Sequence, residues 1–159
     1  MKSVKKIYTL LFVVFGLIAI NTRVFAHCEV PCGIYDDSVR IALIYEHITT
    51  IEKSMNSIIE LSKEATPNYN QLVRWVMNKE SHAEKIQEIV SQYFLHQRIK
   101  VADPADQITY DKYVKSLTIL HQVLVYAMNT KQTTDLGLIE KLRTTVHSFE
   151  ELYFQGHSH

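Results

Sequence analysis

The chain has 159 residues, of which 47% are hydrophobic, with 17 basic and 17 acidic side chains and a formal net charge of zero. This length suits one domain with a proper core and is too short for two domains of typical size. The charges are uneven: residues 1–26 hold four basic residues and no acid, which leaves 13 basic against 17 acidic residues in the remaining 133. That net charge of −4 argues against nucleic-acid binding, which normally shows a basic patch.

Residues 1–26 have the layout of a secretory signal peptide. A basic start, "MKSVKK", precedes an apolar run of 14 residues, Ile7–Ile20, which is shorter than the roughly 20 residues of a membrane-spanning helix. "NTRVFA" then ends in the small residue Ala26. We expect cleavage after Ala26, export to the periplasm or the outside of the cell, and no stable membrane span afterwards. The alternative is an uncleaved N-terminal anchor.

Residues 36–155, which follow a short segment at 27–35, are predicted to be an all-α four-helix bundle, and a short tail follows at 156–159. Asp36, Asp37 and Ser38 are candidate N-caps for a first helix whose apolar positions recur every three or four residues. "ATPNYN" interrupts it, and Thr66-Pro67 is typical of an N-cap and first helical residue. The apolar positions of these two helices are Ile41, Ile44, Tyr45, Ile48, Ile51, Met55, Ile58 and Ile59, and then Leu72, Val73, Val76, Ala83, Ile86, Val90 and Phe94 to about Arg98.

Two more helices follow the break "VADPADQ". We expect Pro104 at the start of the third helix, which ends near Asn129, and Thr134 or Asp135 as the cap of the fourth. Their apolar positions are Tyr113, Val114, Leu117, Leu120, Leu124 and Met128, and then Leu138, Ile139, Leu142, Val146, Phe149 and Tyr153. Four amphipathic helices joined by short loops indicate a four-helix bundle.

Residues 27–35, "HCEVPCGIY", which we call the hook, contain both cysteines of the chain. Cleavage before His27 would give it a free α-amine, which can bind a metal together with the Cys28 amide nitrogen and the Cys28 thiolate. Pro31 and Gly33 allow Cys32 to turn back as a fourth planar donor. A square-planar set of nitrogen and sulfur donors favours nickel or copper over tetrahedral zinc. The His27 imidazole remains available as an axial ligand.

The hook resembles the N-terminal metal-binding segment of the nickel superoxide dismutases, whose pattern is H-C-x-x-P-C-G-x-Y. The matching residues are His27, Cys28, Pro31, Cys32, Gly33 and Tyr35. "SQYF", Ser91–Phe94, is similar to an S-D-Y-F stretch in the helical part of that family. The resemblance implies a four-helix bundle after the hook and a homohexamer.

The resemblance also implies the chemistry. One nickel ion per subunit would be held by His27, Cys28 and Cys32, and superoxide would be converted to dioxygen and hydrogen peroxide as nickel cycles between Ni(II) and Ni(III). His27 and Tyr35 would be the catalytic residues, with Tyr35 lining the approach of the substrate. Tyr93 matches a second family tyrosine close to it, although packing in the core is the simpler interpretation of Tyr93.

The sequence departs from the family where an acid and an arginine commonly fix the axial imidazole. Apolar Ala42 or Leu43 stands at the acid position, Glu46 is a possible substitute, and His82 occupies the arginine position. A solvated helix carboxylate is the simpler interpretation of Glu46.

Two other functions are compatible with the hook. The chain could be an exported nickel- or copper-binding helical module without catalytic turnover. Alternatively, Cys28 and Cys32 could form a disulfide in an exported interaction domain, since oxidising compartments favour disulfides. Such a bridge would close a very small loop.

The ligand assignment predicts that Cys28→Ser and Cys32→Ser each abolish nickel binding, because a hydroxyl lacks the softness of a thiolate. Nickel content per chain, measured on the purified and correctly cleaved protein, checks this. A serine variant that keeps its nickel would contradict the assignment.

Overall fold

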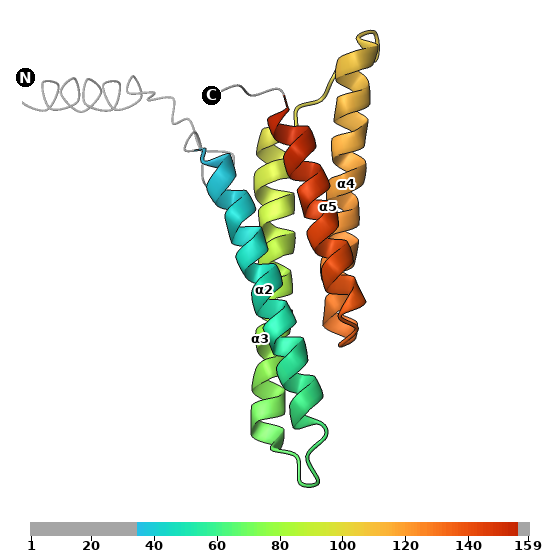
Figure 1. The fold of residues 1–159 in the computed structure, drawn as a ribbon. Helices are drawn as coiled ribbons and strands as arrows, with labels where there is room; N and C mark the ends of the chain where they lie inside the picture. Colours follow the sequence, from blue (N-terminus) through green and yellow to red (C-terminus); the bar gives the residue numbers. More distant parts are fainter. Residues whose placement is uncertain (1–34, 156–159) are drawn as a thin grey trace, which may run out of the picture. The chain divides into compact units, whose positions relative to one another are not determined.

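The computed structural model describes residues 35–155. The helices in this range are α2 (Asp37–Leu61), α3 (Tyr69–Glu88), η1 (Ile89–Arg98), α4 (Gln107–Gln132) and α5 (Gly137–Phe154). Of these, η1 is a π-helix that continues α3 without a break, and no strand occurs between residues 35 and 155. Since α3 and η1 form one continuous rod, the described helices form four rods, which lie side by side (Figure 1). Each rod packs on the next along the chain, and α2 packs against α5. The predicted all-α four-helix bundle is confirmed.

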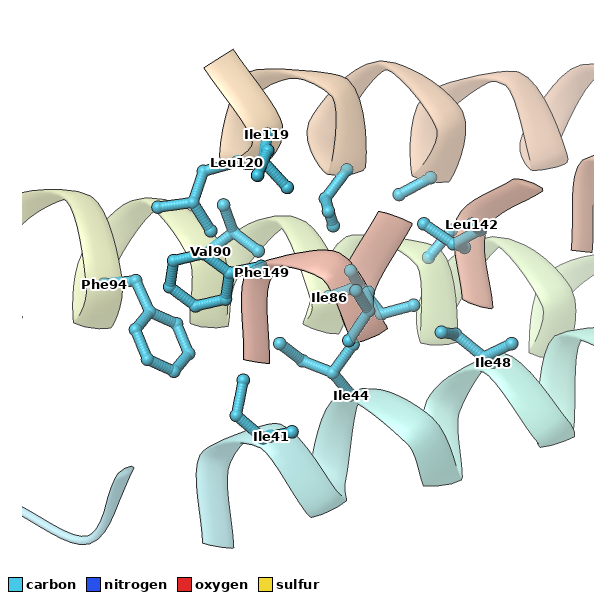
Figure 2. Packing of buried hydrophobic residues seen from close by; sticks show 14 of the residues in the cluster. Ile41, Ile44, Ile48, Ile86, Val90, Phe94, Ile119, Leu120, Leu142 and Phe149 are labelled. Atoms are coloured by element: carbon cyan, nitrogen blue, oxygen red, sulfur yellow. The ribbon is translucent and has the colours of Figure 1, made fainter. Parts of the chain in front are cut away.

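The core consists of aliphatic and aromatic side chains from all four rods. Ile44 and Ile48 of α2 face Ile86 of α3, while Leu142 of α5 approaches from the other side (Figure 2). At the end of the bundle where α2 begins, Phe94 and Phe149 meet edge to face with ring centroids 5.0 Å apart. None of the helices between residues 35 and 155 has the length and apolar character that crossing a membrane requires.

The first and fourth predicted helices are close to those observed. Asp36 is the N-cap of α2, and its carboxylate accepts a hydrogen bond from the Val39 amide at 3.1 Å. The N-cap of α5 is Leu136, which makes no side-chain cap bond, so the predicted cap at Thr134 or Asp135 is wrong by one or two residues. The Asp135 carboxylate nevertheless accepts a hydrogen bond from the Gly137 amide at 2.9 Å. Five of the six apolar positions predicted for the fourth helix are buried: Ile139, Leu142, Val146, Phe149 and Tyr153.

Two predicted helix starts are wrong by a few residues. The helix after "ATP" begins at Tyr69 with Asn68 as its N-cap, so Thr66-Pro67 belongs to the loop. Likewise α4 begins at Gln107 with Asp106 as its cap, and Pro104 lies in the turn before it. In both cases an Asn or Asp further along the chain captures the free amide of the first turn, which outweighs the preference of proline for the first helical position.

Two predicted apolar faces are also wrong in part. In α3, Val73 and Val76 are exposed, and the buried face begins only at Lys79. In α4 the predicted face is rotated, because Val114 and Met128 are exposed. The residues of α4 that are buried are Ser116, Ile119, Leu120, Val123, Ala127 and Thr130. Small polar side chains that bond to their own helix, such as Ser116 to the Lys112 carbonyl at 2.8 Å, allow this contact.

Lys79 links α3 to the end of α4. Only 4% of it is exposed, and its Nζ donates hydrogen bonds to the carbonyls of Lys131 and Thr133 at 2.9 and 3.0 Å. The last carbonyls of a helix have no partner within the helix, so a cation at this point satisfies them. Burial lowers the pKa of Lys79 from its ordinary value, but the two carbonyls stabilise the ammonium.

We therefore expect Lys79→Met to destabilise the bundle by about 1–3 kcal/mol, because the aliphatic stem is kept while two carbonyls lose their donor. Urea denaturation followed by circular dichroism measures the loss. Lys63→Met is the matched control, since Lys63 pairs with Glu60 at 2.8 Å on an exposed surface. That change should cost less than about 0.5 kcal/mol. Equal losses in the two variants would contradict the role assigned to Lys79.

Candidate active site

The hook residues His27, Cys28 and Cys32 lie outside the described residues, which begin at Tyr35, the last residue of the hook. Between residues 35 and 155 no group of three or more His, Cys, Asp and Glu side chains is arranged to hold a metal ion. Tyr35 and its neighbours, at the end of the bundle where α2 starts, are the part of the predicted site that the structure describes.

Asp37, the first residue of α2, is the centre of these surroundings. Arg98 of η1 binds its carboxylate through two parallel hydrogen bonds, Nε to Oδ1 at 2.8 Å and Nη2 to Oδ2 at 2.7 Å. The hydroxyls of Tyr93 and Tyr153 donate to the same carboxylate at 2.6 and 2.8 Å. The side chain of Asp37 is only 14% exposed, and that of Arg98 only 21%. One carboxylate thus joins the start of α2 to η1 and to the end of α5.

Tyr35 lies against this cluster. The guanidinium carbon of Arg98 is 4.3 Å from the centroid of the Tyr35 ring, a close cation–π contact. The Tyr93 ring meets Tyr35 edge to face at 6.2 Å, and the Arg40 guanidinium lies 5.1 Å from the Tyr93 ring. Tyr35 is nevertheless 46% exposed. The structure therefore brings together the two tyrosines selected from the sequence, Tyr35 and Tyr93.

The π-helix explains how Tyr93 and Arg98 reach the same carboxylate. Residues five apart are about 140° from each other around an α-helix, so they face different directions. A π-helix closes its hydrogen bonds between residues five apart, which places such residues one above the other. The Ile99 amide, for example, donates to the Phe94 carbonyl at 2.8 Å. The change from α3 to η1 thus aligns Tyr93 and Arg98 toward α2.

The cluster fixes the ionisation of its members. Burial acts to raise the pKa of Asp37, but the hydrogen bonds from Arg98, Tyr93 and Tyr153 outweigh it and hold that pKa below its ordinary value. Burial and the hydrogen bond to this anion raise the pKa of Tyr153 to about 12 and that of Tyr93 further still. The hydrogen bond to Asp37 raises the pKa of Arg98. At neutral pH Asp37 is an anion, Arg98 is a cation, and both buried phenols keep their protons.

Comparison with known proteins decides among the functions left open by the sequence. The family model described as nickel-containing superoxide dismutase matches residues 22–157. No curated protein and no solved structure matches the chain.

The chain belongs to the nickel-containing superoxide dismutase family. It is therefore an oxidoreductase with nickel as its cofactor and superoxide as its substrate. Membership favours the first of the three functions considered from the sequence over a metal-binding module or a disulfide-containing interaction domain. The matched region includes both the hook and the bundle.

Glu46 and His82, the two residues considered from the sequence as partners of the axial imidazole, lie away from the cluster around Asp37 in this superoxide dismutase. Glu46 follows Asp37 by nine residues, a rise of about 14 Å along α2. His82 of α3 pairs with His47 of α2, the next residue after Glu46, and their Nδ1 atoms are 3.1 Å apart. The structure therefore brings His82 to the Glu46 region of α2 and places neither of them in the cluster around Asp37.

Sequence reasoning missed Arg98 as a neighbour of Tyr35, Arg40 as a neighbour of Tyr93, and Tyr153 as a donor to Asp37, which was assigned only a capping role. The spacing from Tyr93 to Arg98 would have indicated a shared face only if a π-helix had been expected. Nothing in a 3.6-residue period signals such a change. Tyr153 was correctly predicted as a buried position of the fourth helix, but its hydroxyl was not considered.

The pair of His47 and His82 should make stability depend on pH. With Nδ1 atoms 3.1 Å apart, one ring must donate and the other must accept, so the two cannot both be protonated there. Burial is the main cause that lowers the pKa of each ring. For His47 the charge of His82 comes next and then that of Lys85, for His82 the charge of Lys85 comes next, and Glu46 acts in the opposite direction on both. Below pH 6.5, the ordinary pKa of histidine, the unfolded state therefore binds more protons than the folded state. The folded state is stabilised above that pH, and this stabilisation is lost as the pH falls below it.

We accordingly expect the free energy of unfolding to decrease from pH 7 to pH 5, and His82→Gln to flatten this dependence because one of the two titrating rings is gone. Urea denaturation at a series of pH values measures the slope. His121→Gln, at an exposed position of α4, is the control and should keep the wild-type slope. A variant His82→Gln with an unchanged slope would refute the assignment.

Proposed function

We propose that this superoxide dismutase is exported, loses residues 1–26, and holds one nickel ion per subunit at the new N-terminus. The proposed ligands are the α-amine and imidazole of His27, the amide nitrogen and thiolate of Cys28, and the thiolate of Cys32. The donor set fits nickel for two reasons. Thiolates and an ionised amide nitrogen are electron-rich, and four such donors can lie in one plane, which favours a metal that changes its oxidation state by one electron. The observation that carries this proposal is the family match over a region that contains the hook.

When bound, nickel would supply one-electron redox chemistry by cycling between Ni(II) and Ni(III). The overall reaction consumes two superoxide anions and two protons and yields one dioxygen and one hydrogen peroxide. The protein must therefore admit a small anion and supply protons close to the hook. The proposed oligomer is a homohexamer, which would place several such sites in one particle.

The residues around Tyr35 suit the admission of an anion. Arg98 neutralises Asp37, and Arg40, beside Tyr93, balances the exposed carboxylate of Asp36, so these four side chains together carry no net negative charge that would repel superoxide. The Tyr93 hydroxyl donates to Asp37 and its pKa is raised, so this phenol is a poor source of protons. Among residues 35–155 the Tyr35 hydroxyl makes no hydrogen bond, which leaves it able to orient water or the substrate. We infer that Tyr35 lines the approach and that Tyr93 supports it.

The proposal predicts that one glycine added before His27 abolishes activity and nickel binding while the bundle still folds. The extension turns the α-amine into an amide, so one planar donor with a pKa near 8 disappears. Nickel content, superoxide consumption and circular dichroism are measured on the same sample. The control carries one extra glycine after His159 and should be indistinguishable from the wild type.

Full activity in the N-terminally extended protein would overturn the proposed ligand set. Intact-mass analysis of the secreted protein tests the cleavage site directly. A mature chain that starts anywhere other than His27 would overturn the site as well.

A further inference from the structure

We propose that Arg98, anchored by Asp37, is a positioning residue that fixes Tyr35 at the entrance of the site. This inference rests on the role of Tyr35 in the proposed function. It assigns a task to two residues that the hook motif does not include.

The carboxylate of Asp37 anchors Arg98. Arg98 is held by two parallel hydrogen bonds to Asp37, a geometry that a planar guanidinium provides and that fixes its orientation as well as its place. Asp37 is itself held by the hydroxyls of Tyr93 and Tyr153. The plane of Arg98 is therefore determined by groups from α2, η1 and α5 together.

The anchored Arg98 contacts the ring of Tyr35. Tyr35 precedes α2 by two residues, lies outside any helix, and is nearly half exposed, so no helical hydrogen bond fixes its side chain. Its two described ring contacts are the guanidinium of Arg98 at 4.3 Å and the edge of Tyr93 at 6.2 Å. The Arg98 contact is the closer of the two. Tyr35 thus takes its orientation mainly from Arg98.

The consequence for the reaction concerns orientation. A side chain that lines the path of a small anion helps only while it stays in place, and misplacing an aligned group by about 1 Å can cost up to about 100-fold in rate. Removing Arg98 would also leave Asp37 with an uncompensated negative charge close to Tyr35 and Tyr93. Both effects should lower the rate at low superoxide concentration without removing any proposed nickel ligand.

The test uses the mature, nickel-loaded protein and its Arg98→Met and Arg98→Lys variants. Hydroxyl-radical footprinting with peptide mapping gives the ratio of Tyr35 oxidation to Tyr69 oxidation in each protein. Tyr69, which is 71% exposed at the far end of the bundle, is the internal reference. We expect the ratio to rise in both variants, and kcat/KM to fall by about tenfold with unchanged nickel content. Lysine should not restore the wild-type values, since it keeps the charge but lacks the planar, two-pronged group.

Arg143→Met is the matched control. Arg143 pairs with Glu52 at 3.1 Å between α5 and α2, away from Tyr35, and its loss should change neither the footprint ratio nor kcat/KM. Circular dichroism and the melting temperature show whether each variant folds. Should Arg98→Met fail to fold, the more conservative Arg98→Lys decides the matter.

The two proposals fail in different ways. A wild-type protein without nickel or without dismutase activity would overturn the proposed function, while the footprint ratio would still test the contact between Arg98 and Tyr35. An active wild-type protein whose folded Arg98 variants keep both the footprint ratio and kcat/KM would overturn the positioning role. Restoration of both values by lysine would overturn it too, because charge alone would then suffice.

Discussion

The ion pair between Asp37 and Arg98 joins the start of α2, which follows the hook in the sequence, to the end of η1. Asp37 is the first residue of α2, and Arg98 is the last residue of η1. Their two hydrogen bonds are largely shielded from water, and the hydroxyls of Tyr93 and Tyr153 donate to the same carboxylate. Breaking one partner of such a pair leaves a charge without compensation, which costs far more than the loss of an exposed ion pair. The start of α2 is consequently fixed in direction.

This constraint depends on the irregular helix η1. An α-helix throughout would have turned Arg98 away from Tyr93 and left Asp37 with fewer donors. Rare π-helical segments occur frequently at functional sites, and here the segment aligns two side chains toward a single acceptor. The core below it packs in the usual way, with Phe94 of η1 against Phe149 and Tyr153 of α5. The aromatic packing and the polar cluster therefore stabilise the same end of the bundle.

The sequence was sufficient for the parts of the fold that follow a simple period. Ile41, Ile44 and Ile48 recur at helical spacing and are all buried, as predicted. Lys79 was not predicted to be buried, because its partners are backbone carbonyls at the end of another helix, which no pattern in the side chains reveals. Arg98 was missed because its position depends on a change of helix type. The hook motif indicated the family, which the family match confirms, whereas the ligand geometry remains a prediction.

The two tyrosines of the site differ in what their hydroxyls can do. Tyr93 is 3% exposed, and its proton is held on the bond to Asp37. Such a hydroxyl does not release its proton readily, since the phenolate of Tyr93 and the carboxylate of Asp37 would then be two anions 2.6 Å apart. Tyr35 has its ring held by Arg98, while its hydroxyl makes no hydrogen bond within residues 35–155. A fixed ring with an available hydroxyl can orient a small anion without competing for it. The cluster around Asp37 thus holds the ring of Tyr35 in place, whereas the assignment of the chemistry to the hook remains a prediction.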